Sequence, residues 1–473
     1  MLCRTGQSGS ESAFHVQQLQ IFKNMRYAYM IKTDYDVIVV GGGTAGVIAA
    51  IAAGRHGAST LLIEQYGHLG GTAVGGLPFL GMYDGNDKRV NAGIPQELVE
   101  RMKAEGGCLD GCFGATWMDS GYRFSITPYE QETYKYVAQE MVLEAGADIL
   151  FHSFVGDVTA ENGEIKSIEV VNKSGKTRYT AKVYIDTTGD ADVAWMAGVP
   201  MQEKEVTQNA SILFKMGGVD TDKMLTALQE GRGIQGWGNW HTRILKGPRL
   251  DTPEEGLIHM AGHFVDENGK KTTFTAISCI STELYINATR TVNIDGADAQ
   301  SVSLGEISER RNVHRMVEVL NRCVPGFEHA HLISTAPLGI RESRNIQGDY
   351  LLTREDVLSG NQFEDSVARG AYPIDIHDPK GGQTQFQFIE GRGSYSIPYR
   401  SLLPKGISNL LVAGRSLSAT SNGMGSARIM GAVSSQGQAV GTAAAMAAKA
   451  NVTPREINVA ELQRLLTEDK ALL

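Results

Sequence analysis

A glycine-rich turn near residue 43 has the clearest chemical spacing in this sequence. Gly41, Gly43 and Gly46 fit the pattern G-x-G-x-x-G within "DVIVVGGGTAGVIAAIAAG". In such a turn the first glycine allows a tight bend, the second lets backbone approach a pyrophosphate, and the third lets a helix pack on a strand. Glu64 lies eighteen residues after Gly46, close to the position of the acid that binds a ribose hydroxyl. The spacing predicts a dinucleotide site.

The elements that must position this turn can be read on either side of it. Residues 37–40 are a β-branched run typical of a buried strand, residues 45–53 are rich in alanine and predict a helix, and residues 59–63 return to strand character. Residues 37–54 carry no charge, and their number approaches that of a membrane span. Three consecutive glycines argue against a span, because each costs a helix about 1 kcal/mol relative to alanine. We predict a βαβ unit.

The length and composition of the chain exclude several classes of protein. A chain of 473 residues predicts two or three domains, and a net charge of -9 argues against nucleic-acid partners. Five cysteines, an odd number, favour a reduced compartment, so we predict a cytoplasmic protein without a membrane span or a secretory signal. Residues 1–29 are expected to be an N-terminal extension, open to disorder. No metal site is predicted, because Cys108 and Cys112 have no second Cys/His pair at zinc spacing.

Further elements follow along the chain. Residues 128–146 have an apolar stripe at helical spacing and end at Gly146, and residues 147–172 predict a β-meander with a turn at Asn162-Gly163. Residues 182–198 read as strand, turn and helix. Residues 200–390 are more mixed, and a buried strand at 410–413 is followed by a long helix expected from Gly425, with Ser426 as its cap. In that helix Gly437 and Gly441 permit close packing.

Four motifs together give a family resemblance. They are the βαβ unit, "GGTAVGG" (70–76), "IDTTGDADVA" (185–194) and "LLVAGRSLSA" (410–419) with the small-residue helix after it. With "GIRESRNIQGDYLLTREDVLSG", "GAYPIDIH" and "IPYRSLLP", the chain from Asp34 to about Leu466 resembles the FAD-dependent oxidoreductases of the glutathione-reductase-like flavoprotein fold. It looks most similar to the branch distantly related to fumarate reductase flavoprotein subunits.

The resemblance implies an α/β architecture with an inserted domain. A Rossmann-like FAD-binding domain would comprise residues 30–200 and 390–473, and residues 201–389 would form a β-rich (α+β) substrate or cap domain. FAD would be bound non-covalently, since His68 does not match the position of a covalent histidine. A glutathione-reductase redox pair is absent, because Cys108 and Cys112 lie too far from the first motif at the wrong spacing.

The resemblance also implies which residues contact FAD. A helix N-terminus after the fourth motif would stabilise negative charge on the reduced flavin. The expected cofactor-binding residues are Gly41, Gly43, Thr44, Ala45, Gly46, Glu64, Gln65, Gly71, Thr72, Val155, Thr188, Gly189, Asp190, Gly414, Arg415, Gly425 and Ser426.

The candidate catalytic residues are Arg341, Arg344 and Asn422. An arginine is a bidentate fork for a carboxylate or phosphate, so Arg341 or Arg344 could orient an anionic substrate; a structural ion-pair network with Glu342 is the alternative. In a strand only one arginine could reach the cleft, and the other would pair with Glu342 or Asp349. The family often has a Thr-His pair where this sequence has Thr420-Ser421-Asn422, so a histidine acid or base is missing there.

Three residues of "GSYSIPYR" are further candidates for lining the substrate cavity. Tyr395, Tyr399 and Arg400 could line it, or could serve packing alone.

The expected function is hydride transfer between a small organic substrate and flavin N5, with an unknown electron acceptor or donor. Only one complete G-x-G-x-x-G unit with its acid occurs, so no second nucleotide domain for NADPH is expected. A flavin monooxygenase or hydroxylase, and a flavin-free binding protein on the same fold, are the two alternatives. The substrate and the oligomeric state do not follow from the sequence.

Overall fold

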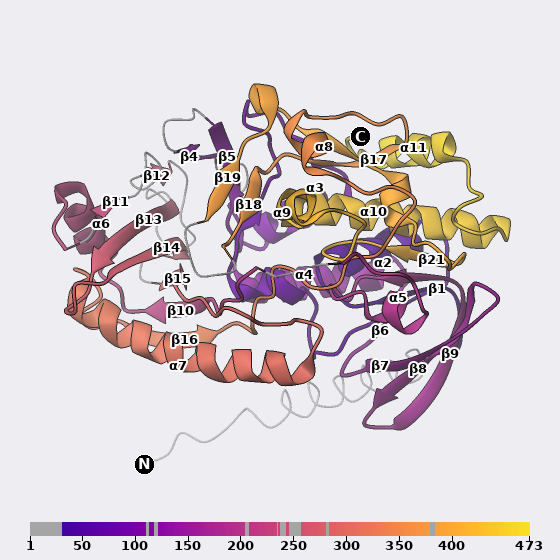
Figure 1. Cartoon of the computed structure of the whole chain (residues 1–473), viewed down its shortest axis with the longest axis horizontal. Coiled ribbons are helices and arrows are strands. Elements are labelled where there is room, and N and C mark those ends of the chain that lie inside the picture. The colour runs from indigo at the N-terminus through magenta and orange to yellow at the C-terminus, as the bar shows by residue number, and fades with distance from the viewer. Residues whose placement is uncertain are drawn as a thin grey trace, which may run out of the picture.

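Figure 1 shows the computed structural model of the protein, with one large sheet on each side of the molecule. The described residues are 31–109, 113–117, 122–203, 208–233, 235–236, 243–245, 257–280, 283–378 and 384–473. The extension expected over 1–29 lies outside these ranges, as does Cys112 of the cysteine pair.

The first sheet carries the predicted βαβ unit. Its strand order is β6-β2-β1-β9-β8-β7, with β21 beside β9. Strands β6, β2, β1, β9 and β21 run parallel, whereas β8 is antiparallel to β7 and β9. Val37 of β1 lies opposite Thr60 on one side and Val183 on the other, so β1 is central. The strands are β1 (Asp34–Val40), β2 (Thr60–Ile63), β6 (Asp148–Leu150), β7 (Phe154–Glu161), β8 (Glu164–Asn172), β9 (Gly175–Asp186) and β21 (Leu410–Val412).

Helix α10 (Met430–Ala450) packs against α2 (Thr44–Arg55), and glycines permit the close approach. A Cβ built at Gly437 would lie 2.4 Å from the carbonyl oxygen of Ala45, and one at Gly441 would lie 2.3 Å from that of Ala49. The two glycines lower helix propensity, but they let the backbones approach so that both helices are buried together. The other helices of this part are α3 (Ile94–Ala104), α4 (Gln131–Glu144), α5 (Asp192–Met196) and α11 (Val459–Glu468).

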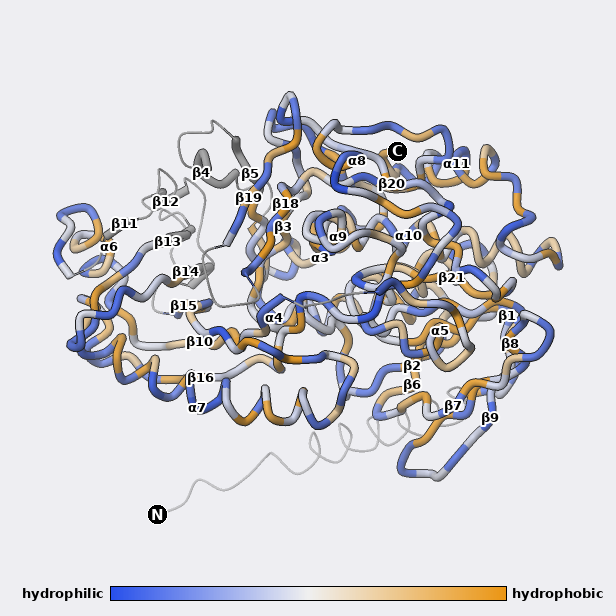
Figure 2. The backbone as a smooth tube through the Cα atoms, viewed as in Figure 1, coloured by the Kyte–Doolittle hydropathy of each residue, from blue (hydrophilic) through white to orange (hydrophobic). Residues whose placement is uncertain are grey.

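The second sheet is antiparallel, with the order β11-β13-β14-β15-β10-β16 and β12 beside β13. The long helix α7 (Ala299–Cys323) runs along it, and Asp298 caps this helix by accepting from the amides of Gln300 and Ser301. In Figure 2 the tube of α7 alternates between blue and orange, as expected for a helix with one apolar face. The other elements are β10 (Phe214–Gly217), α6 (Thr221–Glu230), β11 (Gln235–Gly236), β12 (Arg243–Leu245), β13 (Leu257–Val265), β14 (Lys271–Ile280), β15 (Glu283–Asn287) and β16 (His331–Thr335).

Several short elements lie outside the two large sheets. Apolar residues between Ala210 and Leu338 form the core of the second sheet, whereas Leu352, Val367 and Ile374 belong to the core of α2 and α10. The predicted domain division stays a prediction. These elements are β3 (Phe79–Leu80), β4 (Phe113–Trp117), β5 (Tyr122–Thr127), α8 (Arg354–Leu358), β17 (Ser366–Gly370), β18 (Ile374–Ile376), β19 (Gln385–Gln387), η3 (Glu390–Arg392), β20 (Tyr395–Pro398) and η4 (Tyr399–Leu402).

The expected helix over 128–146 and the meander are present, and the turn between β7 and β8 has positive φ at both Asn162 and Gly163. The expectation of one long helix from Gly425 is wrong. A short helix, α9 (Ser421–Ala427), ends first, and α10 begins at Met430 after an extended residue. This break seats Gly431 against residue 81, where a Cβ would lie 2.7 Å from the carbonyl oxygen of Gly81.

Candidate functional site

The turn between β1 and α2 contains three glycines with different roles. Gly41 has φ +97°, and a Cβ there would lie 2.6 Å from the carbonyl oxygen of Thr187. A Cβ at Gly46 would lie 1.8 Å from the carbonyl oxygen of Gly41. A Cβ at Gly43 would meet nothing within 4 Å. The fold therefore requires the first and third glycines, while the second faces open space.

The N-terminus of α2 lies beside that open space. Its N-cap residue is Gly43, no side chain caps it, and its first turn contains no acidic residue. The first-turn amides of a helix have no intrahelical acceptor and favour an anion. The predicted contacts Thr44 and Ala45 begin this helix and are buried. An uncapped helix end beside a vacant Cβ direction fits a pyrophosphate.

Glu64 follows β2 and is held next to the turn. Its carboxylate accepts from the amide of Gly42 (2.7 Å) and from the amide of Tyr66 (2.8 Å). Burial raises the pKa of Glu64, and these amide hydrogen bonds oppose the rise. Each carboxylate oxygen keeps accepting capacity for a ribose hydroxyl. Gln65, the next predicted contact, is exposed.

The segment η1 (Gly71–Gly75) connects the turn to the second sheet. The amide of Gly70 donates to the carbonyl of Gly42 (2.8 Å), and a Cβ at Gly71 would lie 3.0 Å from the Cα of Gly43. At the other end, a Cβ at Gly75 would lie 3.3 Å from the Cβ of Ala336, directly after β16. Thr72 on this segment is exposed. A ligand following η1 from the turn would thus approach the second sheet.

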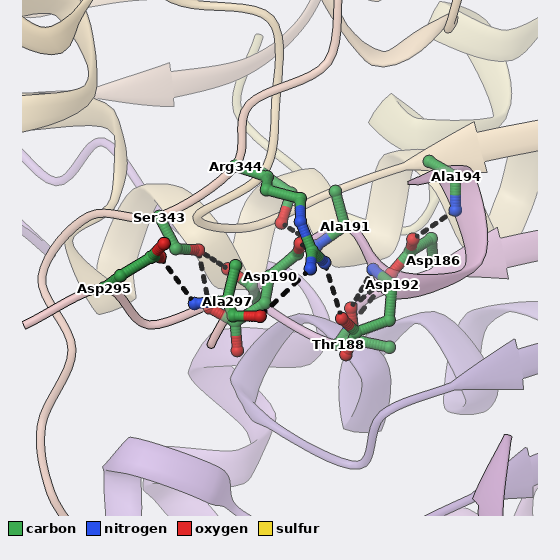
Figure 3. Close-up of polar contacts among 12 residues, drawn as sticks. Asp186, Thr188, Asp190, Ala191, Asp192, Ala194, Asp295, Ala297, Ser343 and Arg344 are labelled. Atoms are coloured by element: carbon green, nitrogen blue, oxygen red, sulfur yellow. Dashed lines mark hydrogen bonds and ion pairs between the residues drawn. The ribbon is translucent and has the colours of Figure 1, made fainter. Parts of the chain in front are cut away.

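The loop after β9 lies against the first glycine, because a Cβ at Gly41 would be 2.9 Å from the Cα of Thr188. Asp186 is fully buried at the base of this loop and accepts from the amides of Thr188 (3.0 Å) and Ala194 (2.9 Å), as Figure 3 shows. Burial raises the pKa of Asp186 to about 6. The loop is thereby fastened to α5.

The third and fourth motifs meet through an ion pair. Arg415 Nη2 lies 2.9 Å from Asp190 Oδ1, and the Ser343 hydroxyl donates to the same carboxylate. Gly189 has φ +86°, and a Cβ there would lie 2.9 Å from Arg415 Nη2. Gly414 lies near Ala45, but its amide donates to Gln436 Oε1 (2.9 Å), so it is engaged within the protein.

Arg344 is held by this same cluster (Figure 3). Its Nη1 donates to Asp192 (2.9 Å) and to the carbonyl of Asp190 (3.1 Å), and its guanidinium lies 4.6 Å from the centre of the Trp195 ring. Pairing with Asp349, one of the two partners expected in the strand case, is not seen, because Asp349 pairs with Arg455. Residues 341–345 are neither helix nor strand, so side-chain alternation does not apply.

Arg341 lies in different surroundings. Its Nη1 donates to the carbonyl of Asn209 (2.6 Å) and to the Ser211 hydroxyl (2.9 Å). Burial, together with the positive charge of Arg428, lowers the pKa of Arg341 to about 9. The structure therefore separates the two predicted arginines.

The fourth motif places Asn422 and Ser426 differently. Asn422 lies in the first turn of α9, is partly exposed, and has no side-chain hydrogen bond to a described residue. Ser426 is fully buried and its hydroxyl donates to the carbonyl of Tyr372. The expected capping role of Ser426 is wrong, since Thr420 caps α9 by accepting from the amide of Gly423. The hydroxyl of Ser426 is therefore engaged within the protein.

The aromatic residues of "GSYSIPYR" favour the packing alternative. The Tyr395 hydroxyl pairs with Ser426 (2.8 Å), and the Tyr399 hydroxyl donates to the carbonyl of Pro454 (2.9 Å). Arg400 is half-exposed and pairs with Asp365.

Two further residues have mainly local contacts. Val155 is buried in β7 opposite Val170, two residues after Ser153, whose amide donates to the carbonyl of Glu64. His68 is partly buried and stacks on Tyr66. Burial lowers the pKa of His68.

Sequence reasoning did not identify the side chains around Arg341. Arg428 directly follows α9, His377 follows β18, and Gln208 lies before the second sheet. An arginine ending "SNGMGSAR" could have been noticed, but nothing in the spacing of the other two points to a common site.

The described residues show neither a metal-ligand cluster nor a membrane-spanning helix. They contain no group of three or more His, Cys, Asp and Glu side chains arranged for a metal ion. Within the same ranges, no helix combines the length and the apolar character needed to cross a bilayer.

Curated proteins match parts of this chain. A dihydrolipoamide dehydrogenase of Chaetomium thermophilum is 26% identical over 225 residues, covering 44% of this chain and 39% of that protein. A digeranylgeranylglycerophospholipid reductase 2 of Methanothermobacter thermautotrophicus is 27% identical over 193 residues, covering 40% and 48%. A 3-oxosteroid 1-dehydrogenase of Mycolicibacterium smegmatis is 48% identical over 46 residues, covering 10% and 8%. The chain thus spans less than half the length of these relatives.

Solved structures resemble the chain more remotely. A geranylgeranyl bacteriochlorophyll reductase-like protein from Thermoplasma acidophilum has a TM-score of 0.46 and 13% identity, covering 92% of this chain and 83% of that one. The p-nitrophenol 4-monooxygenase of Pseudomonas putida has a TM-score of 0.44 and 14% identity, with coverage of 92% and 83%.

The match to a whole family is far more extensive. The family described as FAD dependent oxidoreductase matches residues 36–466, which include both the β1–α2 turn and helix α10. The predicted α/β fold with a Rossmann-like nucleotide unit is confirmed. The chain belongs to the FAD-dependent oxidoreductase family.

Proposed function

We propose that this protein is a FAD-dependent dehydrogenase or reductase acting on a small organic substrate. Its family makes FAD the cofactor. When bound, FAD supplies the hydride acceptor or donor at flavin N5. The observation that carries the proposal is the open space beside Gly43 at the uncapped N-terminus of α2, next to the carboxylate of Glu64.

The nucleotide end of FAD would be held mainly by backbone. Amides of the first turn of α2 donate to the pyrophosphate, and Glu64 accepts from a ribose hydroxyl. Gly71 provides the close backbone approach on the other side of Gly43. The remaining expected FAD contacts are proposed as before, although the hydroxyl of Ser426 bonds Tyr372 and the amide of Gly414 bonds Gln436.

The substrate end would lie where η1 meets the second sheet. Gly75 approaches Ala336 there, and Gly76 approaches Tyr285. Beyond this contact lies Arg341, anchored to Asn209. The protein would orient the substrate with such polar groups while the two cores exclude water. The proposed substrate-orienting residue is Arg341; Arg344 instead supports the loop of Asp190 and Asp192.

The names of the partial relatives support hydrogen transfer over oxygen insertion. They are two dehydrogenases and a reductase, matched over stretches that include only part of each protein. A monooxygenase and a flavin-free protein become outcomes of the test. A second substrate that accepts or donates the electrons is part of the proposal, as is a cytoplasmic location.

The test begins with flavin content. The purified protein should be yellow, should release FAD on acid denaturation, and should melt at a higher temperature with FAD than without it. Candidate substrates are then mixed anaerobically with the holoenzyme and flavin bleaching is followed. For a dehydrogenase, bleaching without oxygen and a dehydrogenated product are expected; for a reductase, the substrate should restore the colour of chemically reduced flavin and be hydrogenated. A hydroxylated product that requires oxygen would make the enzyme a monooxygenase, and a protein that neither carries nor gains FAD would not be a flavoenzyme.

A further inference from the structure

We propose that Arg341 and Arg428, together with Gln208, form a binding site for the carboxylate group of the substrate, which is therefore a small organic monoanion. The inference rests on the proposed function, because it concerns the substrate of the flavin reaction. It is carried by a partly buried arginine, Arg341, that has no carboxylate partner among the described residues, and by two buried donors without acceptors.

Arg341 keeps one edge of its guanidinium unused. Both of its hydrogen bonds are made by Nη1, to Asn209 and Ser211, and both acceptors are uncharged. Within the described part of the chain, no carboxylate lies at ion-pair distance from it, and Nε and Nη2 donate to no residue. The side chain is nonetheless only partly accessible to solvent. Buried charges are normally paired, so an uncompensated arginine fork points to an anionic ligand.

Two more donors at this place lack partners among the described residues. Nε of Arg428 is buried without an acceptor, although Nη2 donates to the carbonyl of Asp375 (3.1 Å). Nε2 of Gln208 is also buried without an acceptor, and this residue is only 4% exposed. An unmade hydrogen bond of a buried donor destabilises the folded protein. A ligand oxygen would remove that cost.

Hydrogen bonds bring these donors together from three parts of the chain. Gln208 Oε1 accepts from the amide of His377 (3.0 Å), and Asn209 Nδ2 donates to the carbonyl of Asp378 (2.8 Å). This joins the segment before the second sheet to the segment after β18. Arg428 joins the end of α9 to Asp375 of β18.

The charge balance favours a monoanion. Arg341, Arg428 and Arg290 bring three positive charges, and Asp375 and Glu309 bring two negative ones. Glu309 is occupied by the amide of residue 212 and the hydroxyl of residue 291. Burial disfavours the ionised Asp375, yet the positive groups around it hold its pKa below the ordinary value. These five groups sum to one positive charge, so a carboxylate matches their charge better than a phosphate dianion does.

His377 does not change this balance at neutral pH. Burial, with the charge of Arg341, lowers the pKa of His377 to about 4. Its Nδ1 lies 3.2 Å from the Thr384 hydroxyl and its Nε2 lies 3.4 Å from Asp375. The neutral imidazole therefore contributes polarity to the site without contributing charge.

The site adjoins the expected flavin end. Arg428 comes directly after α9, and a Cβ at Gly425 in that helix would lie 2.8 Å from the Cδ1 of Ile376, next to His377. A substrate held by its carboxylate here would extend towards the motif that the family resemblance places beside the flavin.

The experiment compares carboxylates with neutral isosteres on the FAD-loaded enzyme. Acetate, benzoate and phenylacetate are titrated against their amides, with calorimetry and the flavin absorbance spectrum as readouts. At least one acid should bind, and its amide should bind at least about tenfold more weakly. Arg341→Lys should weaken binding of that acid by roughly ten- to a hundredfold while FAD content is unchanged, since lysine keeps charge but loses the fork. The matched control Arg400→Lys, at a half-exposed pair with Asp365, should not alter it.

The outcomes separate the two proposals. Equal binding of acids and amides, no binding of any acid, or unchanged affinity in Arg341→Lys would overturn the carboxylate site while the flavoenzyme assignment stands. Tighter binding of inorganic phosphate than of every acid would also overturn it. A protein that takes up no FAD would instead refute the proposed function, and acid binding by that apoprotein can still be measured by calorimetry. If Arg341→Lys does not fold, Gln208→Leu tests the same donors.

Discussion

The nucleotide turn and the arginine site are built in opposite ways. At the turn, Gly41, Gly43 and Gly46 create function by lacking side chains, and the ligand groups are backbone amides with one carboxylate from Glu64. At the arginine site, long side chains from distant segments converge and leave donors unmatched. The first region is therefore damaged by adding atoms, whereas the second is damaged by removing them or by changing their shape.

Because of this difference, substitutions in the two regions should affect stability and ligand binding to different extents. Adding a methyl group at the turn has a cost that depends on which glycine receives it, because one Cβ direction is open and two are closed. In the arginine site, the unmatched donors already represent a cost to the folded protein, which a ligand would offset. Four experiments test this difference between the two regions.

The largest effect is expected from paired substitutions in the turn. Gly46→Ala places a Cβ 1.8 Å from the carbonyl oxygen of Gly41, so β1 and α2 must separate and the protein should fail to fold or lose roughly 3 kcal/mol or more of stability. Gly43→Ala meets no protein atom and has φ -71°, which alanine adopts. This variant should keep the stability of the apoprotein while its FAD affinity falls. Thermal melts with and without FAD measure both effects, and equal behaviour of the two variants would contradict the distinct roles.

The next effect is a pH dependence of the nucleotide region. Burial raises the pKa of Asp186 to about 6 from an ordinary value of 3.8. The folded protein therefore holds a proton that the unfolded chain releases, and the free energy of unfolding should fall as pH rises from about 4 to about 6. The difference corresponds to roughly 3 kcal/mol. Urea unfolding across this range should lose that component in Asp186→Asn, whose carboxamide does not titrate; an unchanged slope would assign the effect to other groups.

Glu64 provides the one carboxylate of the turn. Glu64→Ala should weaken FAD binding by ~1.5–3 kcal/mol, because a charged acceptor for the ribose is lost. It also leaves the amides of Gly42 and Tyr66 without their acceptor. Glu64→Gln keeps one acceptor oxygen and should lose less. Fluorescence titration of the apoprotein with FAD gives both values, and an affinity equal to the parent in both variants would place the ribose elsewhere.

The smallest effect concerns Arg344, the arginine that is already paired. Arg344→Lys loses the stacking on Trp195 and the divided hydrogen bonds to Asp190 and Asp192, and should cost roughly 1–2 kcal/mol of stability. Its carboxylate affinity should match the parent, unlike that of Arg341→Lys. Urea unfolding and benzoate titration test the two statements. Loss of benzoate binding in Arg344→Lys would join the two arginines into one site.

The nucleotide turn could be predicted from the sequence, whereas the arginine site could not. The turn follows from spacing alone, since its glycines and acid occupy one short stretch and act through a local rule. The parallel order of β2, β1 and β9 follows from the same unit. In contrast, Arg341 bonds Asn209, and Gln208 and Arg428 each bond the segment 375–377, through tertiary contacts that no local period in the sequence records.

The errors have similar physical causes. Arg344 pairs with Asp192 because a loop more than 150 residues earlier in the chain folds against it, and local candidates such as Asp349 had other partners. The break between α9 and α10 arises where Gly431 packs on Gly81, again a tertiary contact. Helix propensity alone favoured one continuous helix there.

The glycines of α10 have a consequence for synthesis on the ribosome. Gly437 and Gly441 press against Ala45 and Ala49, so the helix that begins the nucleotide site has its partner almost 400 residues later in the chain. Until that partner emerges, one buried face of α2 is left uncovered, and β9 lacks its neighbour β21. The nascent chain must therefore carry an incomplete nucleotide fold through most of translation, a state in which exposed apolar surface invites chaperones. Full binding of FAD is therefore possible only after α10 has been synthesised and has packed on α2.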